Sequence, residues 1–251
     1  VNVNGVPNAG TVNASPALCF NELQLFDLNN LLDGEDANGV WTEISTVPSS
    51  GIAFDPALGT FSTSNQNPGI YLFEYFLEGE GLCPDDLEVV SVEIYELPIA
   101  AAGLDTEITC EDETTEIGTQ NSSTGPDITY SWTDASGNEV SSESVFTTAV
   151  GGDFLLTVEN TVTGCVDVDD ILVDDKIVVL ALDITDEDVS CYEFNDGLIV
   201  INNVIGGEGP YVYSFDGGVT FSGDNNISEL PAAVYDVVVM DLYGCTNDML
   251  Q

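Results

Sequence analysis

Apolar side chains alternate with other residues along three stretches of the chain, at residues 69–75, 152–158 and 233–239. Each stretch carries an aromatic residue, Tyr71, Phe154 or Tyr235, which precedes the next cysteine by 12 (83 − 71), 11 (165 − 154) or 10 (245 − 235) residues. Alternation with period two, in segments rich in β-branched and aromatic residues, is typical of strands with one face in a core. The three stretches therefore predict equivalent strands of a repeated unit, and helical periodicity is nearly absent.

A second strand with a large aromatic residue is expected between the cysteines of each unit, at Trp41, Trp132 and Tyr213. Aromatic residues in such strand patterns, Tyr235 included, are more often core than carbohydrate-binding surface. Clusters of turn-forming residues suit tight hairpins at Asp33-Gly34, Asn38-Gly39, Ser136-Gly137-Asn138 and Asp216-Gly217-Gly218. Short strands with frequent turns predict an all-β fold of three tandem immunoglobulin-like β-sandwiches, arranged as a linear array.

Six cysteines divide the chain into units of similar size. Pairing neighbours in sequence predicts the disulfides Cys19–Cys83, Cys110–Cys165 and Cys191–Cys245, with separations of 64 (83 − 19), 55 (165 − 110) and 54 (245 − 191) residues. A zinc site is not expected, because the chain has no CxxC pair and no histidine. Structural disulfides indicate an oxidising compartment, so a secreted protein, extracellular or at the cell surface, is expected.

The residues around two prolines suggest where one unit ends and the next begins. Pro7 and Pro98 each precede a cysteine by 12 residues (19 − 7 and 110 − 98), and each follows a short alternating segment. Residues 92–97 are therefore expected to be the last strand of the first domain, and residues 1–6 the last strand of a preceding or neighbouring domain. The predicted domains are 7–97, 98–174 and 175–251.

In the first domain the expected last strand follows Cys83, whereas only a few residues follow Cys245. The third domain is therefore expected to lack its final strand. Two interpretations stay open. Either the chain is a window of a longer polypeptide, or the N-terminal strand of one subunit completes the third domain of its neighbour by β-augmentation.

The charge of the chain restricts its partners. There are 45 acidic residues against one basic residue, Lys176, and the formal net charge is −44. Nucleic acid and anionic membrane surfaces are excluded, because both are bound through Lys and Arg. No apolar run is long enough to span a bilayer, so membrane insertion is not expected. Mutual repulsion of so many carboxylates favours a saline or calcium-rich exterior.

The third domain resembles a SprB-type repeat of the giant gliding adhesins of Bacteroidota. The resemblance is carried by Cys191, Asp196-Gly197, Gly206-Gly207, Pro210-Tyr211-Val212-Tyr213, Asp216-Gly217-Gly218, Leu230-Pro231 and Gly244-Cys245. The second domain is similar to the PKD and Ig-like modules of the same surface proteins through Tyr130-Ser131-Trp132-Thr133 and Gly152-Asp153-Phe154, and the first domain more loosely through Asn38-Gly39-Val40-Trp41. The second domain departs from a standard PKD module after its tryptophan strand, where it has Asp134-Ala135-Ser136-Gly137. The resemblance implies secretion, commonly through a type IX system, and a repetitive architecture without catalytic residues.

Acidic clusters are the candidates for a metal site, and Ca²⁺ is the cation that hard oxygen ligands at alternating positions would bind. The clusters near the boundary of the second and third domains are the preferred ones: Asp167, Asp169, Asp170, Asp174, Asp175, Asp183, Asp186 and Asp188. None of them has the spacing of an EF-hand loop, so a solvated acidic surface is the alternative.

Three N-x-S/T triplets, one in each domain, are candidate glycosylation sites at Asn13, Asn121 and Asn226. Such triplets also arise by chance in a sequence rich in Asn and Ser, and O-linked sugars on surface Ser and Thr are the alternative.

An enzyme is not expected. Pairs of carboxylates occur by chance among 45 acids, and the chain has no histidine and almost no cationic group to tune a base or stabilise an oxyanion. We expect a structural module array of an extracellular fibre or filament, whose partners are copies of itself or flanking domains of the same long chain. The alternatives are an adhesin module that binds surface glycans or another ligand, and an accessory region of a secreted hydrolase.

Overall fold

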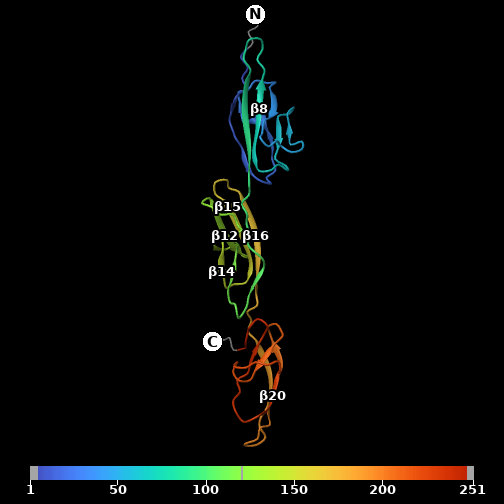
Figure 1. Ribbon diagram of the computed structural model, residues 1–251, viewed down its shortest axis with the longest axis vertical. Helices are drawn as coiled ribbons and strands as arrows, with labels where there is room; N and C mark the ends of the chain where they lie inside the picture. Colours follow the sequence, from blue (N-terminus) through green and yellow to red (C-terminus); the bar gives the residue numbers. More distant parts are fainter. Residues whose placement is uncertain (1–4, 120, 248–251) are drawn as a thin grey trace. The chain divides into compact units, whose positions relative to one another are not determined.

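The computed structural model describes residues 5–119 and 121–247. Apart from one short 3-10 helix, η1 (Leu28–Leu31), its regular elements are all strands (Figure 1). Each strand pairs only with strands nearby in the sequence, which gives three strand groups: β1 to β9, β10 to β16 and β17 to β21. We call them the N-terminal, middle and C-terminal groups. No helix in the described part of the chain is long and apolar enough to cross a membrane.

The N-terminal group is built around a long hairpin of β8 and β9, paired from Gly69↔Ile94 to Leu77↔Asp86. One sheet has the order β2-β9-β8-β5 and a second has the order β3-β7-β6, with a small β1-β4 sheet beside them. Its strands are β1 (Thr11–Val12), β2 (Ala17–Cys19), β3 (Leu25–Asp27), β4 (Leu32–Asp33), β5 (Val40–Glu43), β6 (Phe54–Asp55), β7 (Thr60–Ser62), β8 (Gly69–Leu77) and β9 (Asp86–Tyr95).

The middle group repeats this plan with sheets of order β10-β16-β15-β12-β13 and β11-β14. The ring of Trp132 on β12 contacts Phe146 on β14 at a centroid distance of 5.5 Å, so the two sheets share one core. Its strands are β10 (Thr106–Ile108), β11 (Thr115–Ile117), β12 (Ile128–Asp134), β13 (Glu139–Ser141), β14 (Phe146–Thr148), β15 (Gly152–Asn160) and β16 (Val166–Asp175).

The C-terminal group is smaller, with sheets of order β17-β18-β20 and β19-β21. Its core cluster holds three fully buried residues, Leu180, Ile201 and Val239, against fifteen buried residues in the N-terminal group. Its strands are β17 (Ala181–Glu187), β18 (Gly197–Ile205), β19 (Val212–Ser214), β20 (Asn226–Leu230) and β21 (Val238–Met240).

The strand order is that of immunoglobulin-like sandwiches. In the first two groups the last strand pairs in parallel with an early strand (β9 with β2, β16 with β10) and antiparallel with its hairpin partner, which in turn pairs with the tryptophan strand (β8 with β5, β15 with β12). The predicted fold class, tandem immunoglobulin-like sandwiches, is therefore confirmed. The predicted domain boundaries stay a prediction, because contacts divide the chain into two compact units: residues 1–100 with 123–129 and 157–168, and residues 101–122 with 130–156 and 169–251.

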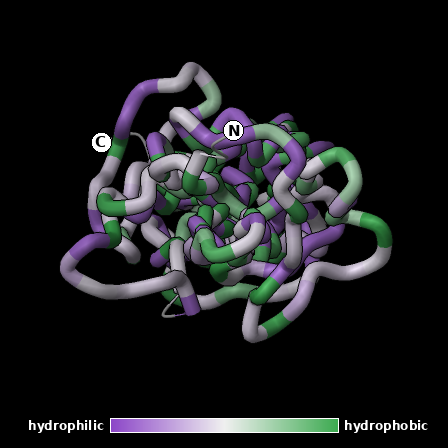
Figure 2. The backbone as a smooth tube through the Cα atoms, turned by 90° about the horizontal axis from the view of Figure 1, so that it is seen from above, coloured by the Kyte–Doolittle hydropathy of each residue, from purple (hydrophilic) through white to green (hydrophobic). Residues whose placement is uncertain are grey.

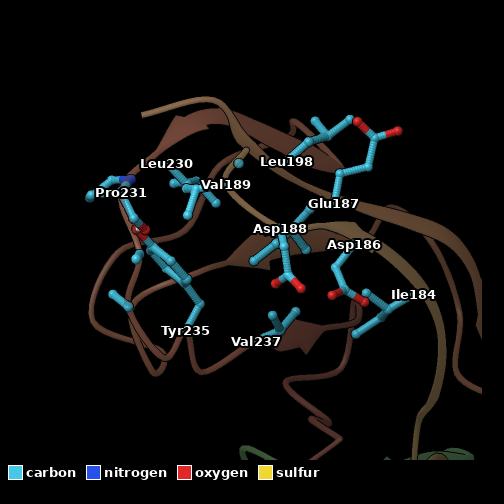
Figure 3. A pocket seen from close by; sticks show the side chains of 14 residues that line it. Ile184, Asp186, Glu187, Asp188, Val189, Leu198, Leu230, Pro231, Tyr235 and Val237 are labelled. Atoms are coloured by element: carbon cyan, nitrogen blue, oxygen red, sulfur yellow. Dashed lines mark hydrogen bonds between the residues drawn. The ribbon is translucent and has the colours of Figure 1, made fainter. Parts of the chain in front are cut away.

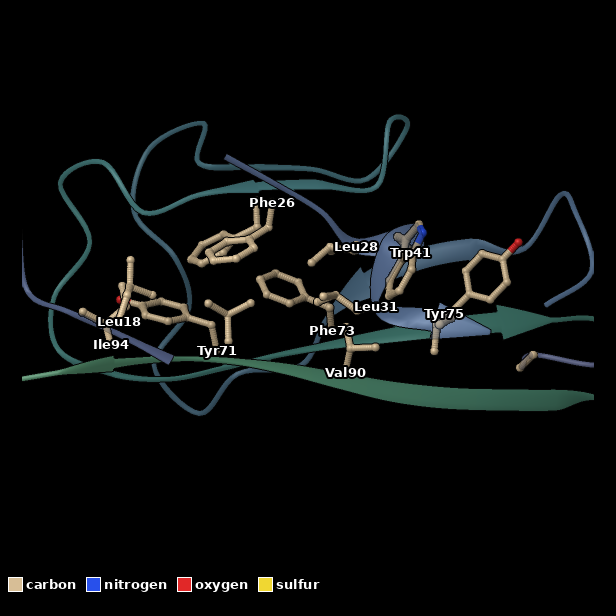
Figure 4. Packing of buried hydrophobic residues seen from close by; sticks show 14 of the residues in the cluster. Leu18, Phe26, Leu28, Leu31, Trp41, Tyr71, Phe73, Tyr75, Val90 and Ile94 are labelled. Atoms are coloured by element: carbon tan, nitrogen blue, oxygen red, sulfur yellow. The ribbon is translucent and has the colours of Figure 1, made fainter. Parts of the chain in front are cut away.

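The core of the N-terminal group is a row of aromatic side chains between its two layers, flanked by aliphatic residues (Figure 4). Phe73 on β8 is completely buried and stacks at about 5 Å from both Phe54 and Phe61. Trp41 is buried too, and its indole N–H donates to Asn29 Oδ1 at 3.0 Å. Figure 2 shows apolar and polar residues interleaved along the backbone, which is the pattern that places alternate side chains in such a core.

The predicted strands at 69–75 and 152–158 lie within β8 and β15. The third prediction, 233–239, is wrong over its first half, because β21 covers only Val238–Met240. The physical reason is the missing partner: β8 and β15 pair along their length with β9 and β16, whereas no strand follows β21 in the described residues. The last strand of the N-terminal group also begins earlier than predicted, at Asp86, and ends at Tyr95.

Replacing Phe73 by alanine should lower the free energy of unfolding of the N-terminal group by roughly 3–5 kcal/mol, because a fully buried ring is lost and a cavity is left. Denaturant unfolding of the variant and the wild-type chain measures the difference. Leu82→Ala is the control: this side chain is fully exposed, and the expected change is within about 0.5 kcal/mol. Equal effects of the two substitutions would contradict the assigned core.

Candidate functional site

The two cysteines of each strand group lie at opposite ends of a long strand. Cys19 is directly opposite Tyr95, the last residue of β9, whereas Cys83 comes three residues before β9 begins. The 12 residues from Cys83 to Tyr95 (95 − 83) span about 40 Å in extended conformation. A disulfide needs Cα atoms within roughly 7 Å, so Cys19 and Cys83 cannot be joined.

The same geometry holds in the other two groups. Cys165 directly precedes β16, and Cys110 follows β10, whose last residue Ile108 is opposite Asp175 at the far end of β16. In the C-terminal group, Cys191 follows the end of β17 that pairs with Leu198, at the beginning of β18. Cys245 lies near the other end of β18, because Asp241 accepts hydrogen bonds from the N–H groups of both Cys245 and Glu208.

The structure therefore forms different disulfides, Cys19–Cys165 and Cys110–Cys245, with Cα–Cα distances of 5.6 and 4.9 Å. The predicted pairs Cys19–Cys83, Cys110–Cys165 and Cys191–Cys245 are wrong, because similar sequence separation does not imply proximity when a long strand lies between the cysteines. In each bond that forms, the first cysteine of one group joins the second cysteine of the next group. The two disulfides indicate an oxidising, extracytoplasmic setting, as expected for a secreted protein.

Backbone hydrogen bonds explain how Cys165 reaches Cys19. The chain leaves β9 at Tyr95, beside Cys19, and two residues after Pro98 the N–H of Ala100 donates to Asp167 Oδ2 at 2.9 Å. This contact places the loop between β15 and β16, which contains Cys165, next to the end of β9. Asp169 Oδ2 accepts the N–H of Ala102 at 2.8 Å in the same way.

The second disulfide has a similar setting. The N–H of Lys176, directly after β16, donates to Ile108 O at 3.0 Å, and the N–H of Cys110 donates to Tyr243 O at 3.1 Å. The sulfur of Cys245 lies 3.4 Å from the carbonyl oxygen of Lys176. The segment after β10 and the loop after β21 are thus joined by a backbone hydrogen bond as well as by the covalent bond.

Cys83 and Cys191 are free thiols, the first half-buried and the second exposed. Cys83 occupies the position of Cys165 and Cys245, after the strand that carries the aromatic residue. Cys191 follows β17 in the way that Cys19 ends β2 and Cys110 follows β10, the early strands that pair in parallel with the last strand of their groups. We call Cys19, Cys110 and Cys191 the first-type cysteines, and Cys83, Cys165 and Cys245 the second-type cysteines. One free cysteine of each type is therefore present.

A groove of about 420 Å³ opens in the C-terminal group (Figure 3). It lies between the ends of β17 and β20, the beginning of β18, and the residues that lead into β21. Carboxylates contribute to the lining through Asp186, Glu187 and Asp188. Apolar side chains form much of the rest, and the larger ones are Ile184, Val189, Leu198, Ile199, Leu230, Tyr235 and Val237.

Tyr235, which lines this groove, is less buried than its counterparts in the other two groups. Its counterparts Tyr71 and Phe154 are 4% and 5% exposed, each on a strand that pairs along its length with the last strand of its group. Tyr235 and Val237 are only half-buried, and they precede β21 without belonging to a strand. Sequence patterns predicted Tyr235 as a core residue, as they did Trp41 and Trp132, but only the two tryptophans are fully buried.

The acidic residues proposed as calcium ligands are dispersed, and several of them bind the backbone. Asp167 and Asp169 accept backbone N–H groups, Asp175 accepts the N–H of Ile177, and Asp174 forms an ion pair with Lys176 at 2.7 Å. Asp170 on β16 and Asp183 on β17 are exposed, and Asp186 and Asp188 line the groove. No group of three or more metal-ligating side chains is brought together among the described residues. Calcium binding stays a prediction.

The candidate glycosylation sites are exposed at all three positions. The side-chain amide of Asn13 donates to Leu32 O and Asp33 Oδ1, and that of Asn226 donates to Asn225 Oδ1. The backbone N–H of Asn121 donates to Thr119 Oγ1. Glycosylation and glycan binding stay predictions.

No protein-family model matches the chain, and no curated protein matches it. Among solved structures, the chain is similar to titin domains I67–I69, with 12% identity over 92% of this chain and 93% of that chain and a TM-score of 0.43. It is also similar to the eight N-terminal Ig domains of Down Syndrome Cell Adhesion Molecule (11% identity, 91% and 36% covered, TM-score 0.41) and to the insect immune protein hemolin (13% identity, 93% and 72% covered, TM-score 0.33). The fold assignment depends on the strand order, because TM-scores this low do not by themselves establish a common fold.

Peptide mapping of the monomeric protein under non-reducing conditions should recover Cys19 linked to Cys165 and Cys110 linked to Cys245. Cys83 and Cys191 should both react with iodoacetamide before reduction, because neither has a partner in the folded chain. An acid protease is suitable, since trypsin has only Lys176 to cut. A peptide joining Cys19 to Cys83 would contradict the strand geometry.

In the turn after β19, one carboxylate, that of Asp216, accepts hydrogen bonds from several donors. Asp216 accepts the hydroxyl of Thr220 at 2.6 Å and the hydroxyl of Ser214 at 2.7 Å, together with the N–H groups of Thr220 and Val219. These hydrogen bonds, those of Thr220 foremost, lower the pKa of Asp216 from 3.8 to about 2. Since the pKa is lower in the folded state, this turn is stabilised above the ordinary pKa, and the stabilisation is lost as the pH falls through about 2.

Thr220→Val should therefore raise the pKa of Asp216 toward its ordinary value, because the principal donor to the charged form is removed. NMR titration of the Asp216 carboxyl group measures the shift. Thr161→Val removes a hydroxyl that donates to Asp127 O in another strand group and is the control, for which no shift at Asp216 is expected. An unchanged pKa in Thr220→Val would show that the hydroxyl contributes little.

Proposed function

We propose that the chain is a subunit of an extracellular fibre in which residues 1–6 of one copy complete the C-terminal group of the next. The observation that carries this proposal is the groove beside β21, at the place where β9 and β16 lie in the other two groups. A structural or adhesive role suits the tandem immunoglobulin-like fold. The SprB-type resemblance and type IX secretion stay predictions from sequence.

The groove needs an extended segment with apolar residues at alternate positions. Such a strand could pair with residues 233–237, which precede β21 without a partner, and cover the half-exposed rings and side chains of Tyr235 and Val237. Extending the β19-β21 sheet in this way would restore the strand order of the other groups, in which the last strand lies next to the strand with the aromatic residue.

Residues 1–6 suit this role by sequence. Val1 and Val3 precede Pro7 by six and four residues, just as Val92 and Ile94 precede Pro98. On β9, Val92 and Ile94 are 0% and 4% exposed and face the core. Val1 and Val3 are thus the expected inward-facing residues of the donated strand.

Charge also favours this segment as the occupant. Residues 1–20 contain no Asp or Glu, although the chain as a whole carries 45 acidic residues. The groove is lined by Asp186 and Asp188, which would repel most other segments of the chain. An uncharged strand enters such a groove without that cost.

Sedimentation of the wild-type chain should show concentration-dependent assembly, and electron microscopy should show fibres. V1D/V3D should remain monomeric, because two carboxylates would be buried in an apolar groove. N2D/N4D adds the same charge on the outward face of the strand and should still assemble. A wild-type chain that stays monomeric at every concentration, or equal assembly of the two variants, would refute the proposed function.

A further inference from the structure

We infer that the two free cysteines form a disulfide between neighbouring copies, from Cys191 of one copy to Cys83 of the next. This inference rests on the proposed function, since the donated strand is what brings the two copies together. It adds a covalent link to an assembly that would otherwise depend on strand pairing alone.

The pairing follows the rule of the two bonds already formed. Cys19 joins Cys165, and Cys110 joins Cys245, so a first-type cysteine always bonds to a second-type cysteine of the next group. Cys191 is a first-type cysteine and Cys83 is a second-type cysteine. The two free cysteines, Cys191 and Cys83, are therefore one first-type and one second-type cysteine, as in the two bonds that form.

A second observation places the entry to the N-terminal group beside Cys83. The N–H of Ala9, two residues after Pro7, donates to Asp86 Oδ2 at 2.7 Å, and Asp86 begins β9 shortly after Cys83. The equivalent bond in the next group joins Ala100, two residues after Pro98, to Asp167 beside Cys165. The chain before Pro7 thus enters next to Cys83 as the chain before Pro98 enters next to Cys165.

The end of the donated strand completes the geometry. The strand before Pro98 is β9, and its last residue lies opposite Cys19. The chain that continues from β9 therefore brings Cys165 of the next group close enough to bond to Cys19. If residues 1–6 occupy the corresponding place in the acceptor, their end lies beside the acceptor's Cys191. Pro7 then leads into the donor's own N-terminal group, where Cys83 is held close to the entering chain.

The bond forms by oxidation of the two thiols. Cys191 Sγ and Cys83 Sγ lose two protons and two electrons, and a small disulfide such as oxidised glutathione accepts them and leaves as two thiol molecules. Cys191 is exposed and Cys83 is half-buried, so both are open to exchange in the free chain.

The test uses two single variants of the full chain in oxidised glutathione buffer, read on non-reducing gels. Of the two free cysteines, C83S retains only Cys191 and C191S retains only Cys83. On the denaturing gel each variant alone should run as a monomer, their equimolar mixture should give a covalent dimer and nothing larger, and the wild-type chain should give a ladder. Peptide mapping of the dimer should recover Cys191 linked to Cys83.

Dimers formed by either variant alone, a bond between Cys83 and Cys191 within one chain, or glutathione adducts on both cysteines without cross-links would overturn the inference. Sedimentation of the double variant C83S/C191S separates this failure from failure of the proposed function. If the double variant assembles and the wild type assembles without the cross-link, strand donation stands and the disulfide does not. If V1D/V3D cross-links through the same two cysteines as efficiently as the wild-type chain, the disulfide stands and strand donation is refuted.

Discussion

The length of the last strand in each group determines which cysteines can meet. A strand such as β9 or β16 is about 30 Å long, and a cysteine lies near each of its ends. A disulfide is short, so a bond across one sandwich is ruled out and a bond to the following group becomes possible. The covalent links therefore connect successive groups instead of closing each one.

This arrangement suits a chain with almost no basic residues. Lys176 forms the one ion pair found in the described part of the chain, with Asp174. The chain entering a group is held instead by a carboxylate near the start of the last strand that accepts a backbone N–H group, as Asp86 and Asp167 do, and the disulfides join successive groups. Neither kind of link requires a cationic side chain. Hydrogen bonds to the charged form also favour ionised carboxylates, as the lowered pKa of Asp216 illustrates.

The C-terminal group has a smaller core cluster than the N-terminal group among the described residues. Its sheet β19-β21 is short, its buried core is limited to a few residues, and Tyr235 remains half-exposed where Tyr71 and Phe154 are buried. Strand formation at 233–237 requires a partner, because an isolated strand leaves its N–H and C=O groups unpaired. Residues 233–237 have no strand beside them among the described residues, and they contribute Tyr235 and Val237 to the lining of the groove.

Sequence alone determined the fold class, the strands β8 and β15 and the buried tryptophans. These features depend on local alternation and on the order of motifs along the chain, both of which are visible in one dimension. Disulfide pairing and the extent of β21 were decided only by the tertiary structure. Cys19 and Cys83 are neighbours in the list of cysteines but lie at opposite ends of β9, and residues 233–237 have a strand pattern without a strand beside them. Both outcomes depend on which segments lie next to one another in space, and spacing along the chain carries no information about that.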